Sequence, residues 1–296
     1  MKYTEKNKPI QCLMTQSTCY KGTSKMTPKG VLWHSTGANN PSIKRYVQPY
    51  VGDPNYDYFM KLLGTNKNGN DWNHIYVKAG VNAWVGKLAD GTVTTIQTLP
   101  WEYMPWGCGQ GKRGSCNNGW IQFEICEDSL NDKNYFEKAY REACELTAYL
   151  CKVYGIDPQA KVRHCGIDVP TILCHYDSHN LGLGSNHGDV YGWFNRYGKT
   201  MQDVRDDVSK IMNGMEDEDM DVSRFKELWS EMRKELQDND SGQWSSEARQ
   251  WAIDNGLIAG NGETVNGQPN YMWCDLLTRE QAVTLFFRFA QLMGKA

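Results

Sequence analysis

Short apolar runs that each end in polar residues recur between residues 30 and 175, and they restrict this part of the chain to a sheet-based fold. Runs of this length bounded by polar, Gly or Asn residues are typical of buried strands. One of them follows the tight turn Asp90-Gly91. The predicted strands are 30–34, 73–77, 82–85, 92–96, 120–125 and 171–175.

A long amphipathic segment over 135–154 interrupts these runs. Its apolar residues recur at spacings of three and four, and Gly155 and Pro158 follow it, so it is predicted to be a helix. A second helix is predicted over 201–212. Strands combined with long helices indicate an α/β fold with a mixed central β-sheet flanked by helices.

The length of 296 residues suits two domains, and composition suggests where they divide. We predict a catalytic domain over 1–213, a linker with a helix over 214–242, and a small helical module over 243–296. The linker begins with the acidic run 216–219. A heptad stripe follows, which either packs on a neighbouring domain or self-associates. Its members are Val222, Phe225, Trp229, Met232 and Leu236.

Charge and hydropathy exclude several classes of function. The net charge of −3 argues against a nucleic-acid binder. No apolar run approaches the ~20 residues of a membrane span. Residues 1–10 are polar and lysine-rich, which does not fit a secretory signal peptide. If the target lies outside the membrane, we expect another factor to release the protein.

The placement of the few histidines suggests a metal site. A hydrolytic zinc site needs three protein ligands and one open position. His34 and His175 each end a predicted strand, and His187 follows in a Gly- and Asn-rich loop. This spacing alone is weak evidence, and other residues of the same region compete as ligands. They are Asp177, His179 and Asp189.

Glu124 lies within an apolar strand, between Phe123 and Ile125. Burial there would raise its pKa and suit it to proton transfer near neutral pH. An outward-facing Glu on a half-exposed strand is an equally good interpretation. A zinc peptidase of the helical type fits poorly, because the chain has no H-E-x-x-H motif. A Cys–His peptidase also fits poorly, because the adjacent Cys174 and His175 would point to opposite faces of a strand.

The region from Gly30 to Met212 resembles the type-2 N-acetylmuramoyl-L-alanine amidases, which share a fold with peptidoglycan recognition proteins, and it is most similar to those of clostridial phages and prophages. Each motif is weak alone, but five of them occur in the family's order. They are W-H-S-T-G at 33–37, D-W-N-H-I-Y at 71–76, W-G-C-G at 106–109, N-G-W-I-Q-F-E at 118–124 and I-L-C-H-Y-D-S-H at 172–179.

The resemblance implies a Zn²⁺ ion bound by His34 and His175. The family's third ligand lies in a loop that reads Gly184-Ser185-Asn186-His187-Gly188-Asp189 here, without the family's proline. We predict His187 as this ligand, with Asp189 as the alternative.

The resemblance also implies hydrolysis of the amide between N-acetylmuramic acid and L-alanine, with Glu124 as the general base. The family's oxyanion-stabilising Lys or Thr corresponds to Ser185, which brings a hydroxyl but no charge. Asn73, His74 and Trp106 are predicted to line the substrate groove. A peptidoglycan-binding domain that does not cut its ligand is the alternative.

The tail resembles one S-layer-homology motif, in 251–262 and 277–282. This implies anchoring to the cell wall, often to a secondary wall polymer. Since a unit of this size buries little surface alone, it needs a partner copy, another domain or self-association. One hypothesis is a homo-oligomer through residues 222–296, in which several copies bind the wall at once. The family also implies a phage lytic enzyme that accumulates in the host cytoplasm and reaches the wall through a holin-type lesion.

Overall fold

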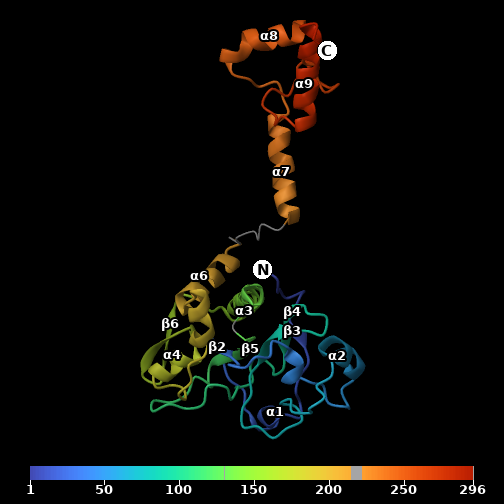
Figure 1. The fold of residues 1–296 in the computed structure, drawn as a ribbon. Helices are drawn as coiled ribbons and strands as arrows, with labels where there is room; N and C mark the ends of the chain where they lie inside the picture. The colour runs from blue at the N-terminus through green and yellow to red at the C-terminus, as the bar shows by residue number, and fades with distance from the viewer. Residues whose placement is uncertain (130, 215–221, 296) are drawn as a thin grey trace. The chain divides into compact units, whose positions relative to one another are not determined.

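The computed structural model describes residues 1–129, 131–214 and 222–295, and the chain divides into two compact units. The first is Met1–Glu216 and the second is Asp217–Ala296 (Figure 1). The acidic run 216–219, predicted to be a linker, lies outside the described residues.

The first unit is built on a sheet that has six strands among the described residues, in the order β1-β4-β3-β5-β2-β8. β2 pairs in parallel with β5 and β8, whereas β3 and β4 are antiparallel, so the sheet is mixed, as predicted. The strands are β1 (Ile10–Gln11), β2 (Gly30–Ser35), β3 (Ala83–Lys87), β4 (Val93–Gln97), β5 (Trp120–Ile125) and β8 (Ile172–Cys174).

Two predicted helices, α3 (Lys133–Tyr154) and α6 (Met201–Met212), pack together on one side of the sheet (Figure 1). The side chain of Asp132 caps the start of α3, and Gly155 ends it in a left-handed conformation at φ 64°. The apolar face of α3 is buried against strand residues such as Trp33 and Phe123. This packing covers one face of the sheet and holds its strands in place.

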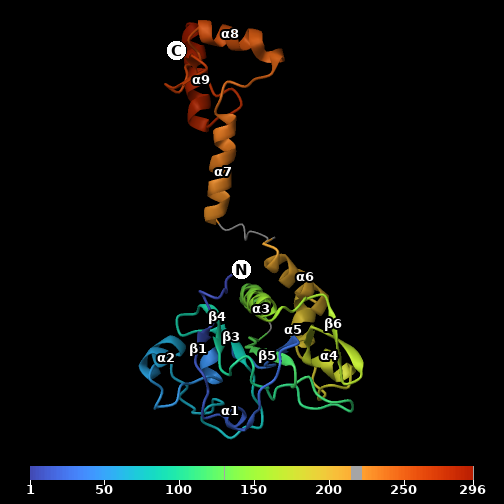
Figure 2. The same ribbon diagram turned by 180° about the vertical axis from the view of Figure 1, so that it is seen from behind.

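The opposite side of the sheet carries the alternate strand residues, because successive side chains point to opposite faces. His34, Gln122 and Glu124 therefore project away from α3. Shorter elements accompany this side, as Figure 2 shows from behind. They are α1 (Thr18–Gly22), η1 (Ile43–Arg45), α2 (Tyr56–Leu63) and α4 (His175–Asn180). The remaining short elements, α5 (Tyr191–Phe194) and η2 (Asn195–Tyr197), pack against α3 on its own side of the sheet.

The strand predicted over 73–77 is wrong, since this segment is a turn followed by irregular backbone. The carboxylate of Asp71 accepts a hydrogen bond from the backbone N–H of Asn73 at 3.1 Å, and this local bond favours a turn. The sequence analysis also missed the hairpin of β6 (Lys161–His164) and β7 (Ile167–Pro170).

The second unit is mainly helical, as predicted. The bidentate ion pair of Arg233 with Asp275 ties α7 to the segment before α9. The side chain of Arg288 on α9 donates to the carbonyl of Leu257, just after α8. The elements are α7 (Val222–Leu236), η3 (Gln243–Ser245), α8 (Ser246–Asp254), β9 (Thr264–Val265), β10 (Gln268–Pro269) and α9 (Arg279–Leu292).

Among the helices of the described residues, none combines the length and the apolar character needed to cross a membrane.

Candidate metal centre

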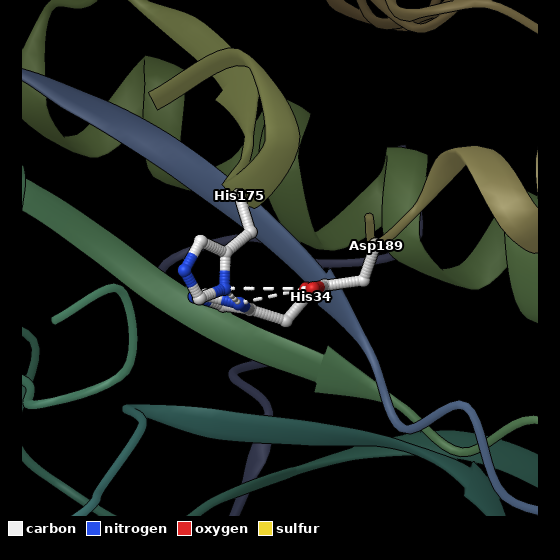
Figure 3. Close-up of side chains that lie close together, drawn as sticks. All are labelled: His34, His175 and Asp189. Atoms are coloured by element: carbon white, nitrogen blue, oxygen red, sulfur yellow. Dashed lines mark hydrogen bonds and ion pairs between the residues drawn. The ribbon is translucent and has the colours of Figure 1, made fainter. Parts of the chain in front are cut away.

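His34, His175 and Asp189 bring three metal-binding side chains to one point (Figure 3). His34 lies near the end of β2, His175 begins α4 directly after β8, and Asp189 comes from the following loop. The Nδ1 atom of His34 is 3.1 Å from Nδ1 of His175 and 3.0 Å from Oδ2 of Asp189. The Nδ1 atom of His175 is 3.5 Å from Oδ1 of Asp189.

Hydrogen bonds to the far side of each imidazole set its tautomer. Nε2–H of His34 donates to the amide oxygen of Gln122 at 2.9 Å. Nε2–H of His175 donates to the Ser185 hydroxyl at 3.1 Å, and that hydroxyl donates to the carbonyl of Cys108. In the neutral form that carries its proton on Nε2, each ring directs the lone pair of Nδ1 toward the same region. A ring that is also protonated on Nδ1 donates to Asp189 instead. Such outer partners are typical of histidines that bind metals.

The buried charges of the site shift the pKa values of its members. Burial lowers the pKa of His34, but the hydrogen bond to Asp189 and the charges of Glu124 and Asp189 outweigh it and raise the net value. Burial lowers the pKa of His175. Burial raises the pKa of Asp189, yet hydrogen bonds from the two histidines bring it well below its usual range. Asp189 is therefore an anion that is ready to bind a cation.

Glu124 stands beside His34, because β2 and β5 pair in parallel with these two residues in register. Burial raises the pKa of Glu124 to about 8. Its Oε2 atom is buried and has no hydrogen-bond partner among the described residues. A carboxyl with a free oxygen and a pKa near neutral can accept and release a proton at working pH.

The loop after α4 contains the other predicted residues. His187 is exposed, its ring packs against that of His175 at 4.5 Å between centroids, and its Nδ1 is 3.1 Å from the Ser185 hydroxyl. His187 is outside the group of three potential ligands found among the described residues. The competing candidates Asp177 and His179 lie in α4 and are also outside this group. The carboxylate of Asp177 accepts from the backbone N–H of Cys174 instead.

Gln122 was missed by the sequence analysis, although a usable signal was present. It precedes Glu124 by two residues on a strand, so the two must share a face of the sheet. Polar residues at that spacing inside an apolar strand indicate a site on that face.

The three predicted substrate residues Asn73, His74 and Trp106 line one open pocket of about 510 Å³. His74 and Trp106 are accessible there, but the Asn73 side chain is buried and its amide bonds the backbone of Gln16 and Gln48. Asn73 thus shapes the pocket.

The donor set fits a metal ion with hydrolytic chemistry. Two imidazoles and one carboxylate are a common ligand set of catalytic zinc, which leaves one coordination position open. In their neutral forms, the converging lone pairs of His34 and His175 beside an ionised Asp189 suit a bound cation, which would take the place of a proton shared between Nδ1 and Asp189.

This chain is similar to known proteins in sequence and in fold. The N-acetylmuramoyl-L-alanine amidase family matches residues 24–182, more than half of the chain. Among solved structures, the hydrolase AmiA of Staphylococcus aureus in complex with its ligand is 22% identical, with 64% of this chain and 80% of that chain covered and a TM-score of 0.41. PlyL is 18% identical, with coverages of 67% and 96% and a TM-score of 0.40.

The PlyG catalytic domain is 19% identical, with coverages of 67% and 93% and a TM-score of 0.40. No curated protein sequence is similar enough to this chain to count as a match. Because the family matches more than half of its residues, this chain belongs to the N-acetylmuramoyl-L-alanine amidase family.

Proposed function

We propose that this protein is a zinc-dependent hydrolase of the amide bond between N-acetylmuramic acid and L-alanine in bacterial peptidoglycan. The observation that supports it most is the buried group His34, His175 and Asp189 with the protonatable Glu124 beside it. A recognition domain that only binds its ligand has no need for a proton carrier at this position.

His34, His175 and Asp189 would hold the ion. Zinc bound there supplies Lewis acidity, which polarises the substrate carbonyl and lowers the pKa of water. We propose Asp189 as the third ligand in place of His187, since its carboxylate already lies within 3.0–3.5 Å of both Nδ1 atoms. Gln122 and Ser185 orient the two imidazoles.

The proposed role of Glu124 is proton transfer. Its carboxylate takes a proton from the attacking water as the new carbon–oxygen bond forms. It then delivers this proton to the L-alanine nitrogen as the carbon–nitrogen bond breaks, so the products are a lactyl carboxyl group and a free amine.

With Asp189 as the third ligand, the family's oxyanion-stabilising position, two residues earlier, becomes His187. Ser185 then takes the role of a link, because its hydroxyl contacts both His175 and His187 at 3.1 Å. Protonated on both nitrogens, the imidazole of His187 would donate from Nδ1 to Ser185 and offer Nε2–H at the rim of the site, where the carbonyl oxygen develops charge.

For the second unit, we propose attachment to the cell wall through the S-layer-homology-like motif, and self-association through α7 and α9. Phe225 and Trp229 on α7 and Phe286 on α9 are exposed within this unit. A hollow of about 470 Å³ between the segment after α8 and α9 offers a site for a wall polymer. We further propose a lytic role in which the enzyme accumulates in the host cytoplasm and then acts on the wall.

Digestion of purified Gram-positive peptidoglycan, with product analysis by mass spectrometry, tests the proposal. We expect stem peptides with a free L-alanine amine and intact glycan strands, loss of activity with a chelator, and recovery with zinc. Binding to the wall without bond cleavage would refute the enzymatic proposal.

Metal content separates the two candidates for the third ligand. We expect Asp189→Ala to lose bound zinc and His187→Ala to retain it. The reverse result would assign the ligand role to His187.

A further inference from the structure

The backbone of Cys108 is linked to both histidines of the metal centre. Its carbonyl accepts from the hydroxyl of Ser185 at 3.2 Å and from the backbone N–H of Ser185 at 2.8 Å. This branch leads to His175, because Nε2 of that ring lies 3.1 Å from the Ser185 hydroxyl. The N–H of Cys108 donates to Oδ1 of Asn117 at 3.1 Å, and this second branch leads to His34.

The side-chain amide of Asn117 has one orientation that satisfies its backbone neighbours. Its Oδ1 faces the N–H of Cys108, which can only donate, and its Nδ2 donates to the carbonyl of Gly109 at 3.4 Å, which can only accept. If this amide were turned over, a donor would face a donor and an acceptor would face an acceptor. Two backbone groups therefore decide that Oδ1 of Asn117 is the atom presented to Gln122.

The orientation of Asn117 determines the orientation of Gln122. Nε2 of Gln122 lies 3.0 Å from Oδ1 of Asn117, and since that oxygen accepts, the NH₂ end of the Gln122 amide must face it. The other end of the amide, Oε1, then faces Nε2 of His34 at 2.9 Å. An acceptor at this point favours the tautomer of His34 that carries its proton on Nε2 and leaves Nδ1 available to a metal ion.

The opposite orientation of Gln122 would favour the wrong tautomer. Its NH₂ group would then face Nε2 of His34 and favour a proton on Nδ1, where Asp189 lies 3.0 Å away as an acceptor. Gln122 is fully buried, so the bond to Asn117 is what opposes this change. The loop backbone also lies directly against the amide, because a Cβ atom at Gly107 would be 2.3 Å from Oε1 of Gln122.

We propose that Asn117 is a positioning residue of the metal centre, which holds His34 in its metal-binding tautomer by orienting Gln122. The inference rests on the proposed function, because it requires that His34 binds the metal ion through Nδ1. Cys108 is the common anchor of both branches. Its N–H acts on one histidine through Asn117, and its carbonyl acts on the other through Ser185.

The zinc affinity of full-length variants, measured by competition with a chromophoric chelator, tests this role without turnover. Asn117→Ala should weaken zinc binding about tenfold, the order of loss that follows removal of an outer partner of a metal-binding histidine. Asn66→Ala is the matched control. The Asn66 side chain also bonds backbone groups, those of Arg45 and Asn68, and its loss should leave the zinc affinity unchanged.

A double-mutant cycle separates positioning from a general loss of structure. Gln122→Met keeps the approximate volume of the side chain but removes the amide through which Asn117 acts. In that background Asn117→Ala should weaken zinc binding no further. Losses that multiply, or an unchanged affinity of Asn117→Ala alone, would overturn the inference and leave the proposed function standing.

Nitrogen NMR of the zinc-loaded wild-type protein adds a test that needs no variant and so cannot fail through misfolding. We expect the imidazole of His34 to carry its proton on Nε2. Zinc bound to Nε2 of His34 instead would overturn the role of Asn117. A wild-type protein that binds no zinc would refute the proposed metal centre together with this inference.

Discussion

The two units of this chain differ in whether their large apolar side chains are buried or exposed. In the first unit, Trp33, Trp84 and Trp193 are fully buried. In the second, Trp244 is 91% exposed and Phe286 is 73% exposed, and Leu257 is the only buried apolar residue among those whose burial is described, 225–295. The first unit therefore holds its site on its own core, whereas the second presents apolar surface of the kind that marks interaction sites.

The largest expected effect concerns the chemistry of the first unit. Glu124→Gln removes the proposed proton carrier but preserves the shape of the side chain, so we expect hydrolysis to fall about 10²–10⁴-fold while bound metal is retained. Glu137→Gln on the exposed face of α3 is the control and should remain fully active. Release of stem peptides and metal content are the measurements. A Glu124→Gln variant with near-normal turnover would refute the role of this residue.

A pair of substitutions tests the difference in burial directly. Trp33→Ala opens a cavity in the core and should cost about 3–5 kcal/mol of the free energy of unfolding of the first unit. Phe286→Ala should change the stability of the second unit by less than about 0.5 kcal/mol at low protein concentration. Denaturant unfolding measures both. An equally large loss for Phe286→Ala in dilute protein would show that α9 is packed within its own unit.

The pH dependence of stability distinguishes the buried site from an ordinary surface. In metal-free protein, burial raises the pKa of Glu124 from 4.5 to about 8. Between these values the native state binds more protons than the unfolded state, so its stability falls as the pH rises through this window. Since a glutamine at this position does not titrate, we expect Glu124→Gln to gain roughly 2–4 kcal/mol over wild type at pH 8 and little at pH 4. Equal pH slopes for the two proteins would contradict this.

The smallest effect concerns the apolar surface of the second unit. If α7 and α9 self-associate, Phe286→Asp should weaken the oligomer about tenfold, or ~1.4 kcal/mol, in sedimentation experiments. Val51→Asp places the same charge on an exposed apolar site of the first unit and should leave association unchanged. A wild-type protein that stays monomeric at all concentrations would remove this explanation of the exposed surface.

Much of the fold was predictable because strand and helix periods are local. The α6 range was predicted to the residue, and Asp132 and Gly155 explain where α3 begins and ends. The segment 73–77 was mistaken for a strand because its apolar residues resemble those of one. The hydrogen bond from its backbone to the Asp71 side chain, which favours a turn, does not show in a hydrophobic pattern.

The site was predictable only in part. The positions of His34 and His175 at the ends of predicted strands indicated a functional role for both. The apolar neighbours of Glu124 on its strand indicated that its carboxylate is buried. The third member depends on how the loop 184–189 folds back, since Asp189 and His187 lie only two residues apart. Which of them reaches the histidines depends on tertiary contacts, such as the bonds of Ser185 to Cys108, and no spacing rule contains these.

The position of Asp189 has a practical consequence for building chimeric enzymes. The family match ends at residue 182, so a module cut there would keep both histidines but lose the carboxylate. It would also lose α6, whose apolar face packs on α3. The smallest exchangeable part that is complete in both respects extends through α6, to about residue 213, and grafts made at that junction are the ones to attempt.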